Sequence, residues 1–191
     1  MNLLAHLLLA ERSDTSFAGQ ILGDEIKGWL DERFAPPIRE GIRLHRAIDR
    51  YSDDHTLHRE LRRTFEPPLR RYAGILVDIG LDHALARQWP AFHADTLNAF
   101  SDTAQRRVIA EWPSQAPFSS ARLAWLARVL AGYAHPEGIQ RALNSVARRL
   151  RRRNEVHLCL PELLARNPIF DDAIAALIYD LDRHVRDVAL P

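Results

Sequence analysis

The sequence of 191 residues is informative first through what it has little of. The single cysteine, Cys159, excludes an internal disulfide and fits a reducing compartment, so we expect a cytoplasmic protein. No apolar run approaches the ~20 residues that cross a bilayer, so no membrane-spanning segment is expected. Only 8 glycines and no alternating β-branched runs argue against a sheet fold. The hydrophobic fraction of 47% and the charged fraction of 27% exclude a disordered or fibrous chain.

Lysine is nearly absent, because Lys27 is the only lysine among the 26 basic residues. A GC-rich genome favours arginine codons and is one explanation. Arginine also binds carboxylates and phosphates through two parallel hydrogen bonds, which is the other. The net charge is only +1, so the sequence predicts no nucleic-acid partner.

Helical periodicity runs through almost the whole chain, with prolines marking the boundaries. Segment 1–10 is apolar but lacks a leading basic residue and a small-residue cleavage site, so we interpret it as a buried helix and not as a secretion signal. We predict an all-α fold in one domain, 1–191, a multi-helix bundle with its metal-site half at about 1–90 and a helical half at about 91–191. The expected helices span residues 2–11, 16–32, 37–52, 55–65, 69–89, 91–101, 103–112, 119–134, 136–153, 160–165 and 168–188.

The segments that best combine aspartate with histidine, 45–55 and 78–83, lie before residue 84. Asp78 and Asp82 are four residues apart, so both carboxylates lie on one face of the predicted helix 69–89, and His83 adjoins them. Because apolar residues precede Asp78, a counter-charge is needed there, and a divalent cation would supply it. The alternative is a solvated face paired with Arg71 and Arg87.

A second group of polar residues lies on the earlier helices. His45 and Asp49 are also four residues apart, and Asp24 and His6 interrupt apolar segments. Surface salt bridges explain His45 and Asp49 equally well, and a lone histidine such as His6 is more often a core residue than a ligand. Taken together, separate helices that each supply aspartate or histidine are typical of a metal site in a helical bundle. The sequence has no glycine-rich phosphate loop, nucleophile elbow, His-Glu-x-x-His or paired Cys-x-x-Cys motif.

At these residues the chain resembles the acyl carrier protein phosphodiesterase family. The matching segments are MNLLAH at 1–6, GIRLHRAIDRYSDDH at 41–55, RRYAGILVD at 70–78 and the pair Asp82-His83. The resemblance implies a bacterial, cytoplasmic enzyme of the divergent, HD-phosphohydrolase-like helical type. Such an enzyme uses a divalent metal to remove the 4'-phosphopantetheine arm from holo acyl carrier protein. The chain departs from the family pattern at Gln20, Glu25, Gly80 and Leu81, which flank the polar positions.

The resemblance does not say which of these residues bind the metal, so the roles of individual residues are our own predictions. We expect manganese as the metal, with magnesium, iron or cobalt as alternatives. The predicted metal ligands are Asp24, His45, Asp78, Asp82 and His83. The predicted catalytic residues are Asp49, which orients a ligating histidine, Arg46, which clamps the phosphate, and His55, which donates a proton. Arg70 and Arg71 are the predicted substrate-binding residues.

The expected partner is holo acyl carrier protein, which the resemblance implies to be small and acidic. The basic groups that would steer it are Arg59, Arg62, Arg63, Arg70 and Arg71. The run 148–153 is another basic patch, for which the alternative is a solvated helix end whose cations favour the helix C-terminus. We expect no membrane partner, and the sequence leaves the oligomeric state open. Two other functions fit the same residues: a metal phosphohydrolase acting on nucleotides or another phosphodiester, and a non-catalytic helical module that binds an acidic partner.

Overall fold

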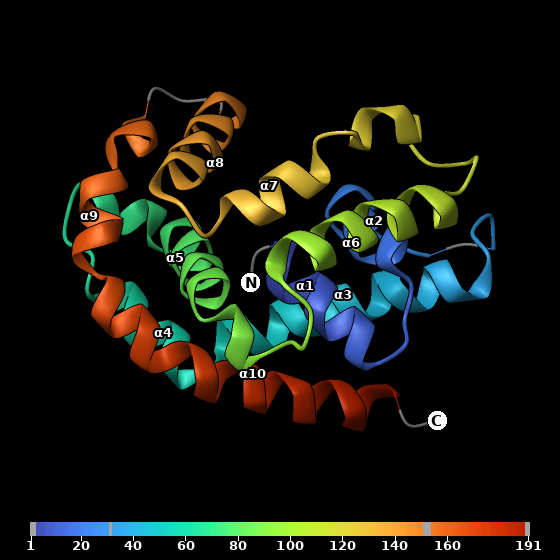
Figure 1. Cartoon of the computed structure of the whole chain (residues 1–191), viewed down its shortest axis with the longest axis horizontal. Coiled ribbons are helices and arrows are strands. Elements are labelled where there is room, and N and C mark those ends of the chain that lie inside the picture. The colour runs from blue at the N-terminus through green and yellow to red at the C-terminus, as the bar shows by residue number, and fades with distance from the viewer. Residues whose placement is uncertain (1–2, 31, 151–153, 190–191) are drawn as a thin grey trace.

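All regular structure in the described part of the chain is helical, as predicted. The computed structural model describes residues 3–30, 32–150 and 154–189 (Figure 1). The helices are α1 (Leu3–Arg12), α2 (Phe17–Glu25), α3 (Pro36–Asp54), α4 (Thr56–Arg63), α5 (Ala73–Arg87), α6 (Leu97–Glu111), α7 (Leu126–Gly132), α8 (Pro136–Arg149), α9 (Leu160–Ala165) and α10 (Asn167–Ala189). Short 3-10 turns lie at Leu69–Tyr72, Trp89–Ala91, Ser120–Leu123 and Val156–Leu158. Among the described helices, none is both long and apolar enough to span a bilayer.

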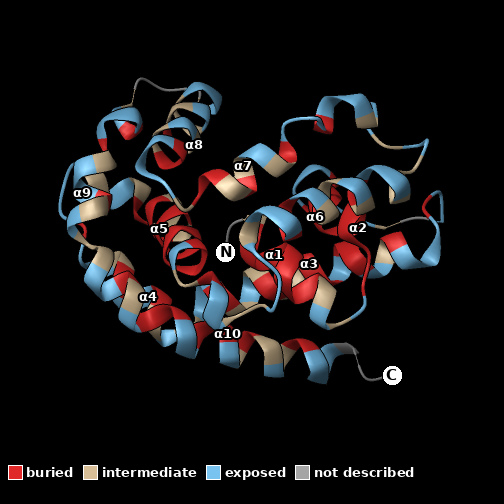
Figure 2. Ribbon diagram, viewed as in Figure 1, coloured by how far each residue is buried: buried red, intermediate tan, exposed pale blue. Residues whose placement is uncertain are grey.

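Helix α1 forms the centre of the molecule. Every residue from Leu4 to Ala10 is buried, so the helix is covered on all sides, as its apolar sequence requires (Figure 2). Helix α10 runs along the lower edge of the view in Figure 1 and packs against α1, α3 and α5. The main hydrophobic core extends over these helices and α6 to α9. A polar residue on α1 therefore meets other helices and not bulk water.

Helices α2 and α3 approach each other closely because glycines face each other where they cross. A Cβ atom on Gly19 would lie 2.6 Å from the Cα atom of Gly41. One turn further along each helix, a Cβ atom on Gly23 would lie 2.2 Å from the Cγ atom of His45. Small residues at these positions let the His45 ring lie directly against the α2 backbone.

The predicted helix 16–32 ends earlier than expected, at Glu25. Ser16 caps its start by accepting the backbone N–H of Gly19, as a serine at that position should. After Ile26 the chain turns through Gly28, which has a φ of 77° that glycine adopts without strain. Asp24 therefore lies in the last turn of α2 instead of at mid-helix.

The predicted helices 91–101 and 103–112 are replaced by one continuous helix, α6, which begins only at Leu97 and ends at Glu111. We expected one helix to end at Ser101 and the next to begin at Thr103, but Ser101 is buried and its hydroxyl donates to the carbonyl of Leu97 one turn earlier. A serine that bonds back in this way stays within a helix. The predicted helices 69–89 and 119–134 each begin with a 3-10 turn before α5 and α7. The arginines at 151–153 lie outside the described residues, and the single-domain boundaries stay a prediction.

Candidate metal centre

Three side chains from two helices meet at the edge of the core, two of them buried and one partly exposed. His6 lies on α1, whereas His45 and Asp49 both lie on α3. The Nε2 atom of His6 is 3.0 Å from Oδ1 of Asp49, and the Nε2 atom of His45 is 3.1 Å from Oδ2 of the same carboxylate. One ligand atom from each residue lies within 4.8 Å of the others. A single aspartate thus connects the imidazoles of His6 and His45, which are 39 residues apart in the sequence.

Local geometry explains why these rings take up this arrangement. His45 and Asp49 lie one turn apart on α3, so they share a face. The His45 ring fits against Gly23 and stacks on the His6 ring, with 4.2 Å between ring centroids and 20° between ring planes. The Nδ1 atom of His45 is buried without a hydrogen-bond partner among the described residues. Packing against Gly23 and His6 therefore orients this ring.

His6 has more acceptors than a neutral imidazole can satisfy. Its Nδ1 lies 3.1 Å from the side-chain oxygen of Gln20, and its Nε2 faces Asp49. Burial lowers the pKa of His6, and the neighbouring charge of His45 acts in the same direction, so the ring is neutral and carries one proton. With Nδ1–H donating to Gln20, the Nε2 lone pair points at the carboxylate. A cation bound at Nε2 would remove that conflict.

Asp24 is the fourth member of the cluster. One of its oxygens lies 3.5 Å from Nε2 of His45, and that interaction lowers the pKa of Asp24. Burial acts to lower the pKa of His45, but Asp24 and Asp49 outweigh it and raise this pKa to about 9. Burial likewise acts to raise the pKa of Asp49, and the two histidines overcome it and hold that pKa below its usual value. Both carboxylates are therefore ionised near neutral pH.

This donor set fits a divalent metal. Imidazole and carboxylate are the ligands expected for manganese, iron or zinc. The nitrogen and oxygen atoms that would bind the ion lie within 4.8 Å of one another, close enough for one ion to be held by all three residues. Gln20 holds Nδ1 of His6 and donates in turn to the carbonyl of Gly41 at 3.3 Å, which is the outer support that a ligating histidine needs.

Comparison with known proteins identifies the family of this chain. The family model described as acyl carrier protein phosphodiesterase matches residues 1–181. The chain belongs to the acyl carrier protein phosphodiesterase family. A relative of that name from Escherichia coli O6:K15:H31 (strain 536 / UPEC) is 34% identical over 187 residues, covering 96% of this chain and 88% of the relative. Another, from Escherichia coli O45:K1 (strain S88 / ExPEC), is 33% identical over the same shares. No solved structure gave a significant match, so the likeness to HD-type phosphohydrolases stays a prediction.

Three of the predicted metal ligands, Asp78, Asp82 and His83, contact groups outside the cluster of His6, His45 and Asp49. Asp82 is fully buried, and its two oxygens accept the backbone N–H groups of Leu4 and Ala5 at 2.8 and 3.2 Å. His83 bonds through Nδ1 to the carbonyl of Tyr133 at 2.6 Å. Asp78 lies 2.9 Å from Nε2 of His58, a fully buried histidine of α4. Their roles as ligands stay a prediction, and the structure does not bring them into the cluster of His6, His45 and Asp49.

Asp82 nevertheless acts on the cluster through the backbone. Its carboxylate caps the first turn of α1, directly before His6. It thereby fixes the end of the helix that carries one of the two stacked imidazoles. Asp82 is in this way a positioning residue for His6.

Two of the predicted catalytic residues also have partners of their own. Arg46 donates from its two terminal nitrogens to the carbonyls of Gly28 and Ile26, at 2.9 and 2.7 Å. His55 follows α3 and lies 3.2 Å from Asp180 of α10. It is ten residues beyond His45, which is about 15 Å along a helix. The structure brings neither of them to the meeting point of His6, His45 and Asp49, and their predicted roles stay untested.

The predicted substrate-binding residues, Arg70 and Arg71, lie exposed in the 3-10 turn before α5, where the Arg71 guanidinium covers the Tyr72 ring.

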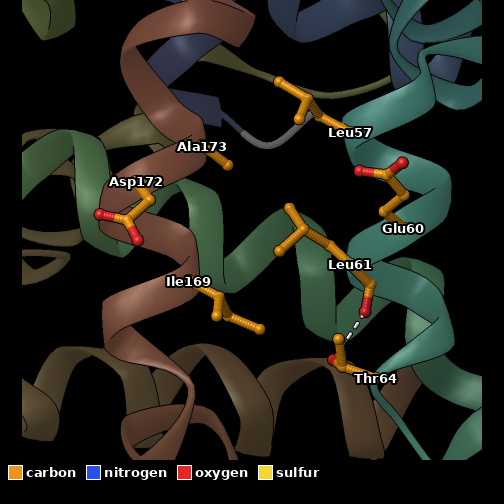
Figure 3. Close-up of a pocket in the computed structure, with 7 residues that line it drawn as sticks. All are labelled: Leu57, Glu60, Leu61, Thr64, Ile169, Asp172 and Ala173. Carbon is orange, nitrogen blue, oxygen red and sulfur yellow. Dashed lines mark hydrogen bonds between the residues drawn. The ribbon is translucent and has the colours of Figure 1, made fainter.

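A separate cavity of about 300 Å³ lies between α4 and α10 (Figure 3). It is lined by Leu57, Glu60, Leu61, Thr64, Ile169, Asp172 and Ala173. None of the predicted site residues lines this cavity.

His6 is the ligand candidate that sequence reasoning did not select. A single histidine on an apolar helix has no local signal that separates a ligand from a core residue. The signal lies in long-range pairing, because the partners of His6 are Gln20 and Asp49, 14 and 43 residues away. Its place in the matching segment MNLLAH is the one cue that the sequence contains.

Proposed function

We propose that this protein hydrolyses the phosphodiester bond that joins 4'-phosphopantetheine to a serine of holo acyl carrier protein, releasing the apo form. Membership of the acyl carrier protein phosphodiesterase family supports the substrate. The meeting of His6, His45 and Asp49 supports the chemistry, and it is the observation on which the proposal depends most.

The cluster has a buried side and an open side. His6 and His45 are buried, whereas the side chains of Asp24 and Asp49 are 72% and 41% exposed. A phosphate group therefore reaches the cluster past two ionised carboxylates, which repel it in the absence of a cation. A divalent ion held by His6, His45, Asp49 and Asp24 would supply positive charge for a phosphate oxygen and acidify a water molecule.

The residues of the chain have distinct parts in this scheme. Gln20 keeps the single proton of His6 on Nδ1 and so leaves Nε2 available as a ligand. Asp49 fixes both imidazoles against each other. We propose Mn²⁺ as the metal, from the resemblance, and the cytoplasm as the location.

The test uses the purified protein with Mn²⁺ and holo acyl carrier protein. Mass spectrometry of the carrier protein should show loss of the phosphopantetheine arm, and chelation of the metal should stop the loss. A protein that leaves the arm intact but hydrolyses nucleotide diesters would contradict the proposed substrate and keep the metal chemistry. A protein inactive on both, with no bound metal, would contradict the proposal as a whole.

A further inference from the structure

Four arginines follow one face of α3. Arg39, Arg43, Arg46 and Arg50 recur at steps of four, three and four residues, which places them along one stripe of a helix. We call these four residues the α3 arginine stripe. From Arg39 to Arg50 there are eleven residue steps, a rise of about 16 Å along the helix. It is long enough to lie alongside a helix of a partner protein.

The charges of the stripe are largely uncompensated within the described part of the chain. Arg43 and Arg50 are exposed and form no ion pair with a described carboxylate. The Nε atom of Arg39 is buried without a hydrogen-bond partner among those residues. Two acidic residues, Glu40 and Asp49, lie between Arg39 and Arg50 in the sequence. Glu40 is about 100° around the helix from Arg39 and so lies off the stripe.

The loop after α2, which carries an exposed tryptophan, lies beside the α3 arginine stripe. Arg46 holds the carbonyls of Ile26 and Gly28, so the loop after α2 lies against the middle of α3. The next residue, Trp29, is 88% exposed, and Lys27 in the same loop is exposed as well. An exposed tryptophan beside arginines is the composition typical of the residues that dominate protein interfaces.

The α3 arginine stripe also adjoins the candidate metal centre. Arg46 follows His45 directly, and Arg50 follows Asp49. The loop that Arg46 holds begins two residues after Asp24. A partner seated on the stripe therefore lies next to the open carboxylate side of the cluster.

We propose that the α3 arginine stripe, together with Lys27 and Trp29, is the docking surface for an acidic face of the carrier protein. The inference rests on the proposed function and names the surface that presents the substrate to it. Arginines pair with carboxylates, and Trp29 supplies apolar contact that a nucleic-acid backbone would not use. Arg46 is a positioning residue in this arrangement, because it acts by holding the loop.

The test measures binding apart from hydrolysis. Fluorescence anisotropy of labelled apo acyl carrier protein, without metal, reports docking of a partner that has no arm to lose. The double variant Arg43→Glu with Arg50→Glu should raise the Kd at least about tenfold and make it less dependent on salt. Trp29→Ala should raise the Kd by a similar factor and leave the salt dependence as it is.

The matched control is the double variant Arg148→Glu with Arg149→Glu, because both are exposed arginines on α8, which lies well apart from α2 and α3 in Figure 1. It makes the same charge change and should keep the Kd of the parent protein. Circular dichroism checks that each variant is folded. A folded double variant that binds like the parent, or a parent that prefers an oligonucleotide to the carrier protein, would overturn the inference. If the parent binds the carrier protein without releasing its arm, the docking surface stands and the proposed function fails.

Discussion

At the scale of single residues, the carboxylate of Asp49 connects the candidate metal centre. Its two oxygens lie 3.0 and 3.1 Å from the Nε2 atoms of two different histidines. Any change to this carboxylate therefore affects both imidazoles. A change to His83, whose Nδ1 is bonded to the Tyr133 carbonyl, affects neither.

Asp49→Asn tests the role of this charge at nearly constant shape. The amide cannot supply the negative charge that both histidines and a bound cation use. We therefore expect Mn²⁺ affinity to fall at least about 100-fold, which is the largest loss typical of removing a group that supports a metal ligand. Isothermal titration calorimetry with Mn²⁺ measures it. His83→Gln is the comparison, and its affinity should stay near that of the parent. The reverse order of the two variants would favour the ligands predicted from the sequence.

Asp82 gives a prediction about pH. Burial raises the pKa of Asp82 to about 7, against the opposing hydrogen bonds from Leu4 and Ala5. The folded state then holds this proton more tightly than the unfolded chain, whose pKa is about 3.9. The contribution of Asp82 to the free energy of unfolding therefore falls as pH rises from about 4 to about 7. Urea denaturation at about pH 5 and about pH 8 measures it.

Asp82→Asn carries no such proton, and its amide still offers one acceptor to the start of α1. The parent should exceed this variant in free energy of unfolding by more at about pH 5 than at about pH 8. Equal differences at the two pH values would show that Asp82 is not the titrating group.

At the scale of elements, the crossing of α2 and α3 decides whether the cluster forms. Gly19 and Gly23 lie one turn apart on α2 and face Gly41 and His45, one turn apart on α3. The helices approach closely enough for the His45 ring to lie against the α2 backbone. The same spacing is visible in the sequence, but it does not reveal which helix faces which.

Gly23→Ala tests this contact. The new Cβ atom would lie 2.2 Å from the His45 ring, which must shift, so we expect Mn²⁺ affinity to fall about 10-fold or more. Gly74→Ala is the matched control, since a Cβ atom there meets nothing within 4 Å on α5. That variant should keep its Mn²⁺ affinity and gain about 0.5–1 kcal/mol of stability. Equal metal affinity in both variants would contradict the packing argument.

The helices could be predicted where prolines and caps mark them, as at Ser16 and Pro36. They could not be predicted where a polar residue has an internal partner. Ser101 was predicted to end a helix but bonds back to Leu97 within α6. Helix α2 ends at Glu25, and the loop that follows it is held by Arg46, twenty-one residues later. Such contacts depend on tertiary structure, which a local pattern does not contain.

At the scale of the whole molecule, the candidate metal centre joins the central helix α1 to α2 and α3. His45 and Asp49 could be predicted from their spacing, and Asp24 from its polar position in an apolar segment. His6 could not, because its partners come from other helices. Asp82 has the polarity of a ligand, yet it caps α1, and this contact spans 78 residues of sequence.

A bound metal should stabilise the whole fold, because the three helices that it joins separate on unfolding. At a free Mn²⁺ concentration of about 100 times the Kd, the gain is about 2.7 kcal/mol. Differential scanning calorimetry should show a Tm that rises with Mn²⁺ and returns to its starting value after chelation. A Tm independent of Mn²⁺ would indicate that no metal binds the folded protein preferentially.

The most direct test of the central claim is a crystal structure of the protein grown with Mn²⁺, with anomalous diffraction collected at the manganese absorption edge. We predict an anomalous peak within bonding distance of Nε2 of His6, Nε2 of His45 and the Asp49 carboxylate. A peak beside Asp78, Asp82 and His83, or none in the molecule, would contradict the account.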